Sequence, residues 1–408
     1  MLPRTTLRLC SERLRLVRHI AALALALALS PRAVLAHDPD TWGGLFRSHD
    51  AGATWMPVSP GIFTSGALAL AVSPRDPNHL LLATDSGMWR SRNGGRDWDV
   101  EAPDILTGPA FAAAFDADGA RALVAGPSTL FRHDGDRWRP LAAPVGAMPA
   151  RALVAASVLG RVYLVGKSGL YRSDDWGGSW TNIGSALQGD HVDSLIAPSG
   201  RPEEVYAVAG GAVWSSRDAG RGWQLRCDGS AADAIEVVGP DSSDPARLWA
   251  VGGGQVLRSD RQGERWRGVG KPIPEGPATA RAVAVSGHVI LIATDRGVFR
   301  SVDAGGSWEP PKEGLPAHLA AGVLTRDPRN PSTVYAGFAV AQYADLLPRV
   351  PQTGGAFGGV GWMTAVGGVV ILLLLALSAI VAVQHLVRTR VRPDPNGARS
   401  ERRSVVSR

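Results

Sequence analysis

Ser48-His49-Asp50-Ala51-Gly52-Ala53-Thr54-Trp55 is the first of seven copies of an eight-residue pattern that recurs along this chain of 408 residues. We call this pattern the box. The other copies lie at 91–98, 133–138, 173–180, 216–223, 259–266 and 301–308; the third is shortened, and the sixth has Arg261 where Asp is expected. The Trp residues that close the boxes are 40 to 43 positions apart. A period of this length is typical of a four-stranded propeller blade.

The sequence around each box predicts short β-strands. In the second repeat, strand-like runs at Ala67–Val72, 79–83 and 87–91 are separated by turn signals, and the box then leads into a fourth strand. The expected fold is therefore an all-β, seven-bladed propeller over residues 37–340, with one box in each blade.

The two ends of the repeat region predict how the ring closes. The first box has no inner strands before it, and the runs Leu319–Leu324 and Thr333–Phe338 have no box after them. We expect residues 44–48 to pair with 333–338 in one shared blade, because this pairing removes the open sheet edges.

Turn chemistry accounts for the residue types of the box. A short Asp or Asn side chain accepts hydrogen bonds from nearby backbone N–H groups. Gly adopts the positive φ of a tight turn, and Trp offers a large apolar face that can pack between blades. We therefore assign the box residues to structure and not to catalysis. They are Asp50, Asn93, Asp134, Asp175, Asp218, Asp303, Trp55, Trp98, Trp138, Trp180, Trp223, Trp266 and Trp308.

The pattern Ser-x-Asp-x-Gly-x-Thr-Trp resembles the Asp-box, or BNR repeat. Sialidases, some glucan hydrolases, sortilin-type receptors and the photosystem II assembly/stability factor family share this repeat. The resemblance covers about 300 residues and implies a propeller, but it says little about activity, because function depends on sites grafted on a fold. Sialidases have six blades and carry boxes on only some of them. A box on each of seven blades is more similar to the assembly-factor family.

The sequence offers little support for a sialidase-like active site. Such a site would need an Arg cluster, a Tyr nucleophile with a Glu partner and an acidic Asp, and the family's Phe/Tyr-Arg-Ile-Pro motif is missing near the first blade. Apolar strand runs, where a core role is expected, contain Tyr163, Tyr171, Tyr206 and Tyr335. A hydrolase with two carboxylates remains open, but we interpret the acidic pairs Asp174-Asp175 and Glu203-Glu204 as solvated turns. No catalytic residue is assigned.

Polar residues at the starts of the innermost strands would line the mouth of the central channel. Arg151 and Arg281 occupy equivalent places in two blades, and His191 and Asp193 lie near the same place in a third. One interpretation is a polar funnel that binds an acidic peptide or a small anion. The other is an ordinary hydrated lining, which channel mouths have by default. The sequence indicates no metal site and no cofactor.

The positive charge of the chain belongs to its ends. Of the formal net charge of +6, residues 1–36 and 384–408 each contribute +5, and the segment between them carries −4. A nucleic-acid-binding domain would need basic residues clustered on its folded part. Nucleic acid is therefore not an expected partner.

The same two ends predict export and membrane attachment. Residues 1–36 combine five Arg before an apolar run with a small-residue cleavage site after it, which predicts a secretory signal peptide; an uncleaved anchor is the alternative. Residues 359–383 carry no charge and are long enough to cross a bilayer. The seven Arg of 384–408 predict a cytoplasmic tail. The propeller would then lie on the extracytoplasmic side of the cell membrane, joined by the linker 341–358 to a single-pass anchor.

The linker also suggests a different attachment. Val350-Pro351-Gln352-Thr353-Gly354 resembles the L-P-x-T-G sorting signal of surface proteins, with Val in the first place. A sortase would cleave between Thr353 and Gly354 and anchor the chain to the cell wall. Short motifs match easily by chance, and the tail is longer than such signals usually carry. We therefore favour the membrane anchor over cell-wall attachment.

Two classes of function fit these features. The first is a membrane-tethered, non-catalytic propeller that binds a protein or peptide and assists the assembly of a membrane complex. The second is an exported glycoside hydrolase or glycan-binding propeller, which rests on the repeat resemblance alone.

The structural assignment of the boxes predicts that Trp180→Ala lowers stability. A buried aromatic truncated to Ala typically costs about 3–5 kcal/mol, so the melting temperature should fall. Thermal unfolding of the two proteins checks this. An unchanged melting temperature together with loss of a specific activity would contradict a structural role.

Overall fold

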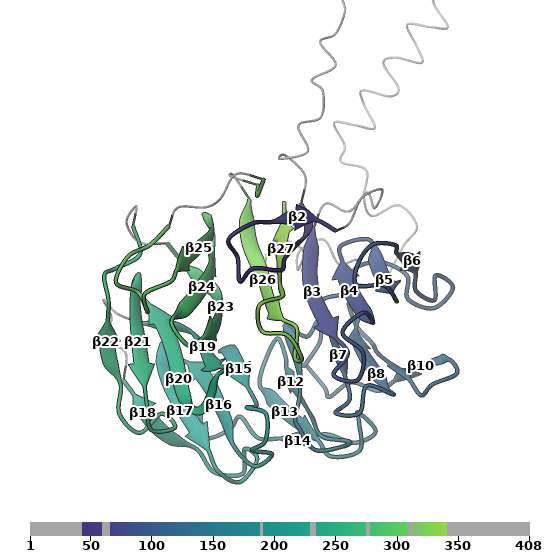
Figure 1. Ribbon diagram of the computed structural model, residues 1–408. Coiled ribbons are helices and arrows are strands. Elements are labelled where there is room, and N and C mark those ends of the chain that lie inside the picture. Colours follow the sequence, from purple (N-terminus) through teal and green to yellow (C-terminus); the bar gives the residue numbers. More distant parts are fainter. Residues whose placement is uncertain are drawn as a thin grey trace, which may run out of the picture. The chain divides into compact units, whose positions relative to one another are not determined.

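All regular elements that the structure describes are β-strands, which confirms an all-β propeller (Figure 1). The computed structural model describes residues 43–58, 66–187, 191–228, 234–274, 278–309, 314–316 and 319–340. Outside them lie the expected signal peptide at 1–36, the linker at 341–358 with Thr353 and Gly354, the span at 359–383 and the tail at 384–408. Within the described ranges, no helix has the length and apolar character needed to span a membrane.

Five four-stranded antiparallel sheets form separate blades. The sheet that joins both ends of the described chain has the order β2 (Met56–Pro57), β1 (Gly44–Ser48), β27 (Val334–Ala339), β26 (Ala320–Arg326). The next has β3 (Ala67–Val72), β4 (Leu80–Thr84), β5 (Gly87–Ser91), β6 (Asp99–Val100). The third has β7 (Ala112–Phe115), β8 (Ala122–Ala125), β9 (Leu130–His133), β10 (Trp138–Leu141). The fourth has β11 (Ala152–Ala155), β12 (Val162–Val165), β13 (Leu170–Ser173), β14 (Thr181–Asn182). The fifth has β15 (Val192–Ile196), β16 (Val205–Ala209), β17 (Ala212–Ser216), β18 (Gln224–Cys227).

The sequence predicts two more separate blades here, and this is wrong, because the remaining seven strands form one sheet. Its order is β22 (Arg267–Val269), β21 (Gln255–Ser259), β20 (Asp244–Gly252), β19 (Ile235–Asp241), β23 (Ala280–Ser286), β24 (Val289–Thr294), β25 (Gly297–Ser301). One parallel pair, Asp241 with Val285, joins its two halves. A Cβ on Gly239 would lie 2.6 Å from Cγ1 of Val283, so only glycine allows β19 and β23 to approach this closely.

The expected closure of the ring is confirmed. Strand β1 pairs antiparallel with β27 in a register that runs from Gly44 opposite Phe338 to Ser48 opposite Val334. Strands from the two ends of the described chain therefore share one sheet (Figure 1). Apolar side chains of neighbouring blades fill the space between the sheets; Phe46 and Phe338 of the shared sheet, for example, belong to one buried cluster with Leu291 of β24 and Val298 of β25.

Each full box is a turn held by its Ser and Asp side chains. In the first box the Ser48 hydroxyl donates to Asp50 Oδ1 at 2.7 Å and accepts the N–H of Gly52 at 2.7 Å. Asp50 Oδ1 also accepts the N–H of Thr54 at 2.8 Å. The boxes that begin at Ser173, Ser216 and Ser301 repeat these bonds at 2.7–2.8 Å.

Two boxes depart from this arrangement. Asp134 of the shortened box was expected to hold its turn, but it pairs with Arg132 at 2.9 Å, and the N–H of Gly135 donates to His133 Nδ1. In the sixth box, where Arg261 replaces Asp, Ser259 still accepts the N–H of Gly263 at 3.0 Å. The box at Ser91 keeps the arrangement although Asn93 takes the place of Asp, because Asn93 Oδ1 accepts the N–H of Asp97 at 2.9 Å.

The fourth residue of the box links neighbouring blades. Ala219 has a positive φ of 58°, and its N–H donates to the carbonyl of Glu203 in its own blade at 2.8 Å. Its carbonyl accepts from the guanidinium of Arg172 in the preceding blade at 2.9 Å. Arg47 donates in the same way to the carbonyl of Gly94, and Arg300 to that of Ala51.

Three box Trp residues, Trp98, Trp223 and Trp308, form the reverse link, and most box Trp residues are less buried than expected. Only Trp55 and Trp138 are buried; the others are half-buried. The indole N–H of Trp98 donates to the carbonyl of Val58 at 2.6 Å, and that of Trp223 donates to Ile183 at 2.7 Å. Each of these two acceptor residues directly follows the outer strand of the preceding blade. These bonds therefore join the outer parts of two neighbouring blades.

Arg172→Met should destabilise the propeller. The change keeps most of the side chain's bulk but leaves the Ala219 carbonyl without its charged donor, which typically costs about 1–3 kcal/mol. Urea unfolding of the variant checks this. Arg137→Met, at an exposed position, is the matched control and should unfold like the parent.

Asp303→Asn should reduce the acid sensitivity of folding. The hydroxyl and then the N–H of Ser307 hold the pKa of Asp303 at about 2, below its ordinary value of 3.8. A lowered pKa stabilises the fold above about pH 4, and this stabilisation disappears as the pH falls toward 2. Asn93 shows that Asn can hold the same turn. Between pH 5 and 2 the melting temperature should therefore fall less in the variant; parallel curves would refute this role.

Candidate binding site at the channel mouth

The innermost strands β3, β7, β11, β15, β19, β23 and β26 form a ring in which successive members lie in contact. In five of them, the pairing with the second strand skips one residue near the start of the inner strand. The skipped residues are Leu68, Asp193, Glu236, Arg281 and Gly322. A bulge of this kind leaves a residue unpaired and redirects its side chain. The bulges therefore define a ring of equivalent positions at the mouth.

Three of the four predicted mouth residues come together. Arg151 Nη1 donates to Asp193 Oδ1 at 3.2 Å, and His191 Nε2 lies 3.3 Å from the same oxygen. The Asp193 side chain is 37% exposed and that of His191 is 55% exposed, so both remain accessible to a ligand. The ion pair spans β11 and β15 and thus joins two blades at the mouth.

Arg281 lies apart from this group. It occupies the bulge of β23, is exposed, and forms no hydrogen bond or ion pair with any other described residue. None of the five N–H donors of its guanidinium is therefore used by another residue that the structure describes.

The sequence analysis missed Glu236, which occupies the bulge of β19 between Asp193 and Arg281 in the ring order. Its Oε2 accepts the N–H of Ala280 at 2.5 Å. Burial raises the pKa of Glu236, and the nearby carboxylate of Asp295 raises it further, although the Ala280 hydrogen bond opposes this. Glu236 and Asp193 each lie 23 residues before the Ser that opens the next box, so aligning the repeats on the boxes would have placed Glu236 at the position of Asp193.

Charge at the mouth is distributed unevenly. Four successive inner strands present Arg151, Asp193, Glu236 and Arg281, so that two acidic residues lie between two basic ones in the ring order. The next two, β26 and β3, present Gly322 and the half-buried Leu68. This arrangement suits a ligand with polar groups on one side and an apolar group on the other.

We interpreted the acidic pairs Asp174-Asp175 and Glu203-Glu204 as solvated turns, but three of their four carboxylates form ion pairs. Asp174 accepts from Arg161 at 2.7 Å and pairs with Arg172, and Glu203 also accepts from Arg161, at 2.9 Å. Glu204 pairs with Arg201 at 3.0 Å. These carboxylates join strands and blades, which leaves them poorly placed for acid–base chemistry.

The Tyr residues largely follow the prediction of a core role. Tyr163, Tyr206 and Tyr335 are buried, whereas Tyr171 is half-buried and donates to the Ser168 carbonyl at 3.1 Å. None of them lies at the mouth, since β12, β13, β16 and β27 are not inner strands. Among the described residues, no three His, Cys, Asp or Glu side chains are grouped so that they could hold a metal ion.

Comparison with known proteins supports the fold. No family model matches the chain, and no curated protein sequence matches it. Among solved structures, YCF48 bound to D1 peptide has 17% sequence identity and a TM-score of 0.52, covering 68% of this chain and 94% of that one. YCF48 from Cyanidioschyzon merolae has 15% identity and a TM-score of 0.51, covering 68% and 97%. The chain shares their β-propeller fold.

A glycoside hydrolase is similar to a comparable degree. The GH74 xyloglucanase from Xanthomonas campestris has 19% identity and a TM-score of 0.53, covering 68% of this chain and 51% of that one. Identities this low identify a fold and not an activity. The residues at the mouth must therefore decide between the two classes of function.

Proposed function

We propose that this protein is a non-catalytic binding propeller that holds a peptide segment of a partner protein at its channel mouth. The observation that carries the proposal is the mouth itself, where the Arg151–Asp193–His191 group and the unpaired Arg281 stand on bulged or equivalent positions of the inner strands. Such groups bind a peptide backbone and charged side chains without doing chemistry on them.

The fold comparison agrees with this class of partner. One similar structure is described as bound to a D1 peptide, and the boxes of this chain resemble those of the photosystem II assembly/stability factor family. A role in assembling a membrane complex fits these two resemblances.

The location and full blade count are parts of the proposal. A signal peptide at 1–36 and a span at 359–383 would hold the propeller on the extracytoplasmic face of the membrane. The sheet β19–β25 contains two boxes and two inner strands. We count it as two blades, which gives the ring seven.

A glycoside hydrolase is the second candidate, because one observation favours it. Burial raises the pKa of Glu236, and the nearby carboxylate of Asp295 raises it further. Glycosidases divide the acid and base roles between two carboxyl groups, one of which has a raised pKa. Against it, Glu236 already accepts the N–H of Ala280, which holds its carboxylate against β23.

Affinity purification from native membranes tests the proposal. The full-length tagged protein should retain a protein partner, and the double variant Arg151→Ala/Arg281→Ala should recover that partner about tenfold less, as expected for the loss of charged hydrogen bonds. The control Arg137→Ala changes an exposed Arg outside the mouth and should recover the partner like the parent.

Glycan binding and hydrolysis distinguish the second candidate. The same preparations are applied to a glycan array and to a panel of polysaccharide substrates. Hydrolysis that Glu236→Gln abolishes would establish the hydrolase and overturn the non-catalytic proposal. Equal partner recovery from parent and double variant would exclude the mouth as the binding site.

A further inference from the structure

One repeat lacks the Arg that the other six carry, and this Arg bonds to the next box in three of them, at Arg47, Arg172 and Arg300. In six repeats the residue before the first box position is Arg, namely Arg47, Arg90, Arg132, Arg172, Arg258 and Arg300. In β17 this residue is Ser215. The link to the next blade is still made there, because the Tyr206 hydroxyl donates to the carbonyl of Gln262, the fourth residue of the next box, at 3.1 Å.

Arg226 of the outer strand fills part of the space. Its Nε donates to Ser215 Oγ at 2.7 Å, and its Nη2 donates to Gln224 Oε1 at 2.7 Å. In two other blades, the Arg that precedes the box pairs with a carboxylate of the same blade. Arg90 pairs with Glu101 at 2.6 Å, and Arg300 pairs with Glu309 at 3.1 Å. Among the described residues, Arg226 bonds only to the neutral acceptors Ser215 and Gln224 and forms no ion pair with a carboxylate.

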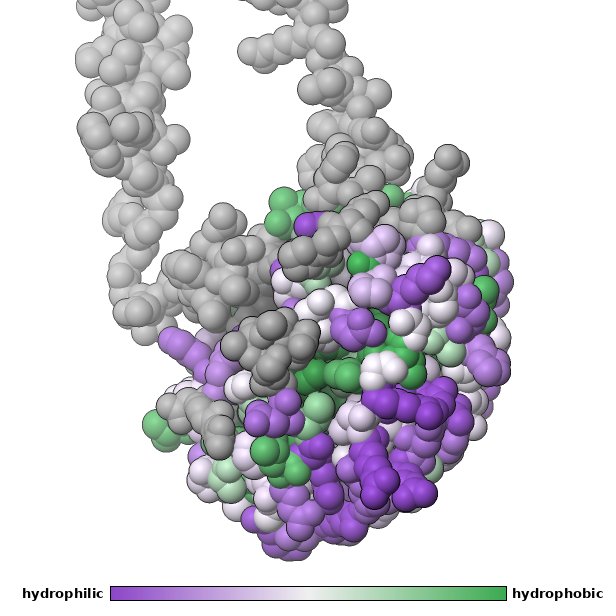
Figure 2. Space-filling model, turned by 90° about the vertical axis from the view of Figure 1, so that its left-hand side faces the viewer, coloured by the Kyte–Doolittle hydropathy of each residue, from purple (hydrophilic) through white to green (hydrophobic). Residues whose placement is uncertain are grey.

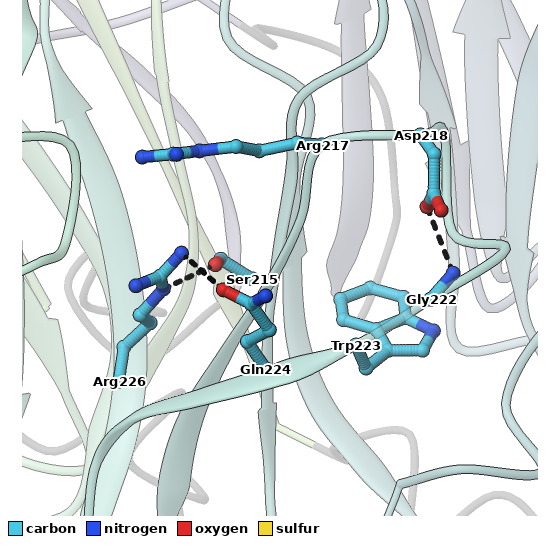
Figure 3. A pocket seen from close by; sticks show the side chains of 7 residues that line it. All are labelled: Ser215, Arg217, Asp218, Gly222, Trp223, Gln224 and Arg226. Atoms are coloured by element: carbon cyan, nitrogen blue, oxygen red, sulfur yellow. Dashed lines mark hydrogen bonds between the residues drawn. The ribbon is translucent and has the colours of Figure 1, made fainter.

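A cavity of about 270 Å³ opens beside these residues, on the outer side of the blade and not at the mouth. Arg217 and Trp223 also line it, and the guanidinium groups of Arg217 and Arg226 extend to the same side in the close view (Figure 3). Arg217 pairs with Glu264 at 2.9 Å but remains 54% exposed.

The carboxylate of Asp218 also lines the cavity, but it belongs to the box turn. It accepts the Ser216 hydroxyl at 2.7 Å and the N–H of Gly222 at 2.8 Å. The dashed bond to Gly222 lies at the Trp223 end, away from Arg226 (Figure 3). The Arg226 end of the cavity is therefore its cationic end.

The strand that carries Arg226 has a free edge. Strand β18 is the last in its sheet, and at four residues it is longer than the two-residue outer strands β2, β6 and β14. Leu225 on it is 46% exposed. Figure 2 views the molecule from the side where β18 and β22 lie in Figure 1, and it shows hydrophilic side chains interspersed with small apolar areas. An edge of this kind can accept an added strand.

We propose that the edge of β18 binds an extended segment of a partner protein and that an acidic side chain of this segment enters the cavity beside Arg226. The added strand would pair with β18 through its backbone and contact Leu225. The carboxylate would pair with the free N–H groups of Arg226 and supply the negative charge that Glu101 and Glu309 supply in the other blades. This site is separate from the mouth and does not depend on the function proposed for it.

Two labelled hexapeptides test the site on the full-length protein in detergent. One alternates Thr and Glu, and the other alternates Thr and Gln; both are blocked at their ends, and binding is measured by fluorescence anisotropy. The parent should bind the Glu peptide about tenfold more tightly than the Gln peptide, the ratio expected for one charge-assisted hydrogen-bonded pair. Raising the salt concentration should reduce this ratio.

Variants separate the cavity from its surroundings. Arg226→Gln should bind both peptides equally, and Ser215→Arg, which restores the residue of the other repeats, should fill the cavity and weaken binding of both. Arg221→Gln, which changes an exposed Arg on the same box that does not line the cavity, should bind like the parent. Failure of the parent to prefer the Glu peptide, or an unchanged preference in a folded Arg226→Gln protein, would overturn the proposal.

Discussion

The propeller depends on the turn in which a Ser hydroxyl and an Asp carboxylate hold two consecutive residues at positive φ. Ala51 and Gly52 have φ values of 55° and 83° in the first box, a conformation that costs an Ala energy unless its surroundings impose it. The hydrogen bonds of Ser48 and Asp50 stabilise this turn locally. Its repetition at nearly constant spacing makes one blade like the next.

The turn also orients the groups that join the blades. With the fourth box residue at positive φ, its N–H points to its own blade and its carbonyl to the preceding one, as at Ala219. Arginine suits this carbonyl because one planar group can serve several acceptors. Arg300, for example, donates to the Ala51 carbonyl and pairs with Glu309. The ring is therefore closed by polar bonds at the rim as well as by apolar packing between sheets.

Both binding sites that we propose lie where this regularity is interrupted. The bulges of the inner strands leave Asp193, Glu236 and Arg281 without a paired position and available to a ligand. The replacement of an arginine by Ser215 opens a cavity at the rim. In both places the fold is already stabilised by neighbouring repeats, so one blade can carry an unusual residue without loss of the ring.

The sequence by itself determined the propeller class, the strand positions and the closure of the ring, because each follows from a local pattern repeated seven times. It also predicted Arg151, His191, Asp193 and Arg281 as candidate binding residues, since residues at equivalent repeat positions are expected at equivalent places in space. Only the tertiary structure showed that Asp193 lies between Arg151 and His191, while Arg281 has no ion-pair partner in the described part of the chain. The merging of β19 with β23 and the role of Glu236 were also decided there. These features depend on contacts between residues about 40 positions apart, which no local pattern encodes.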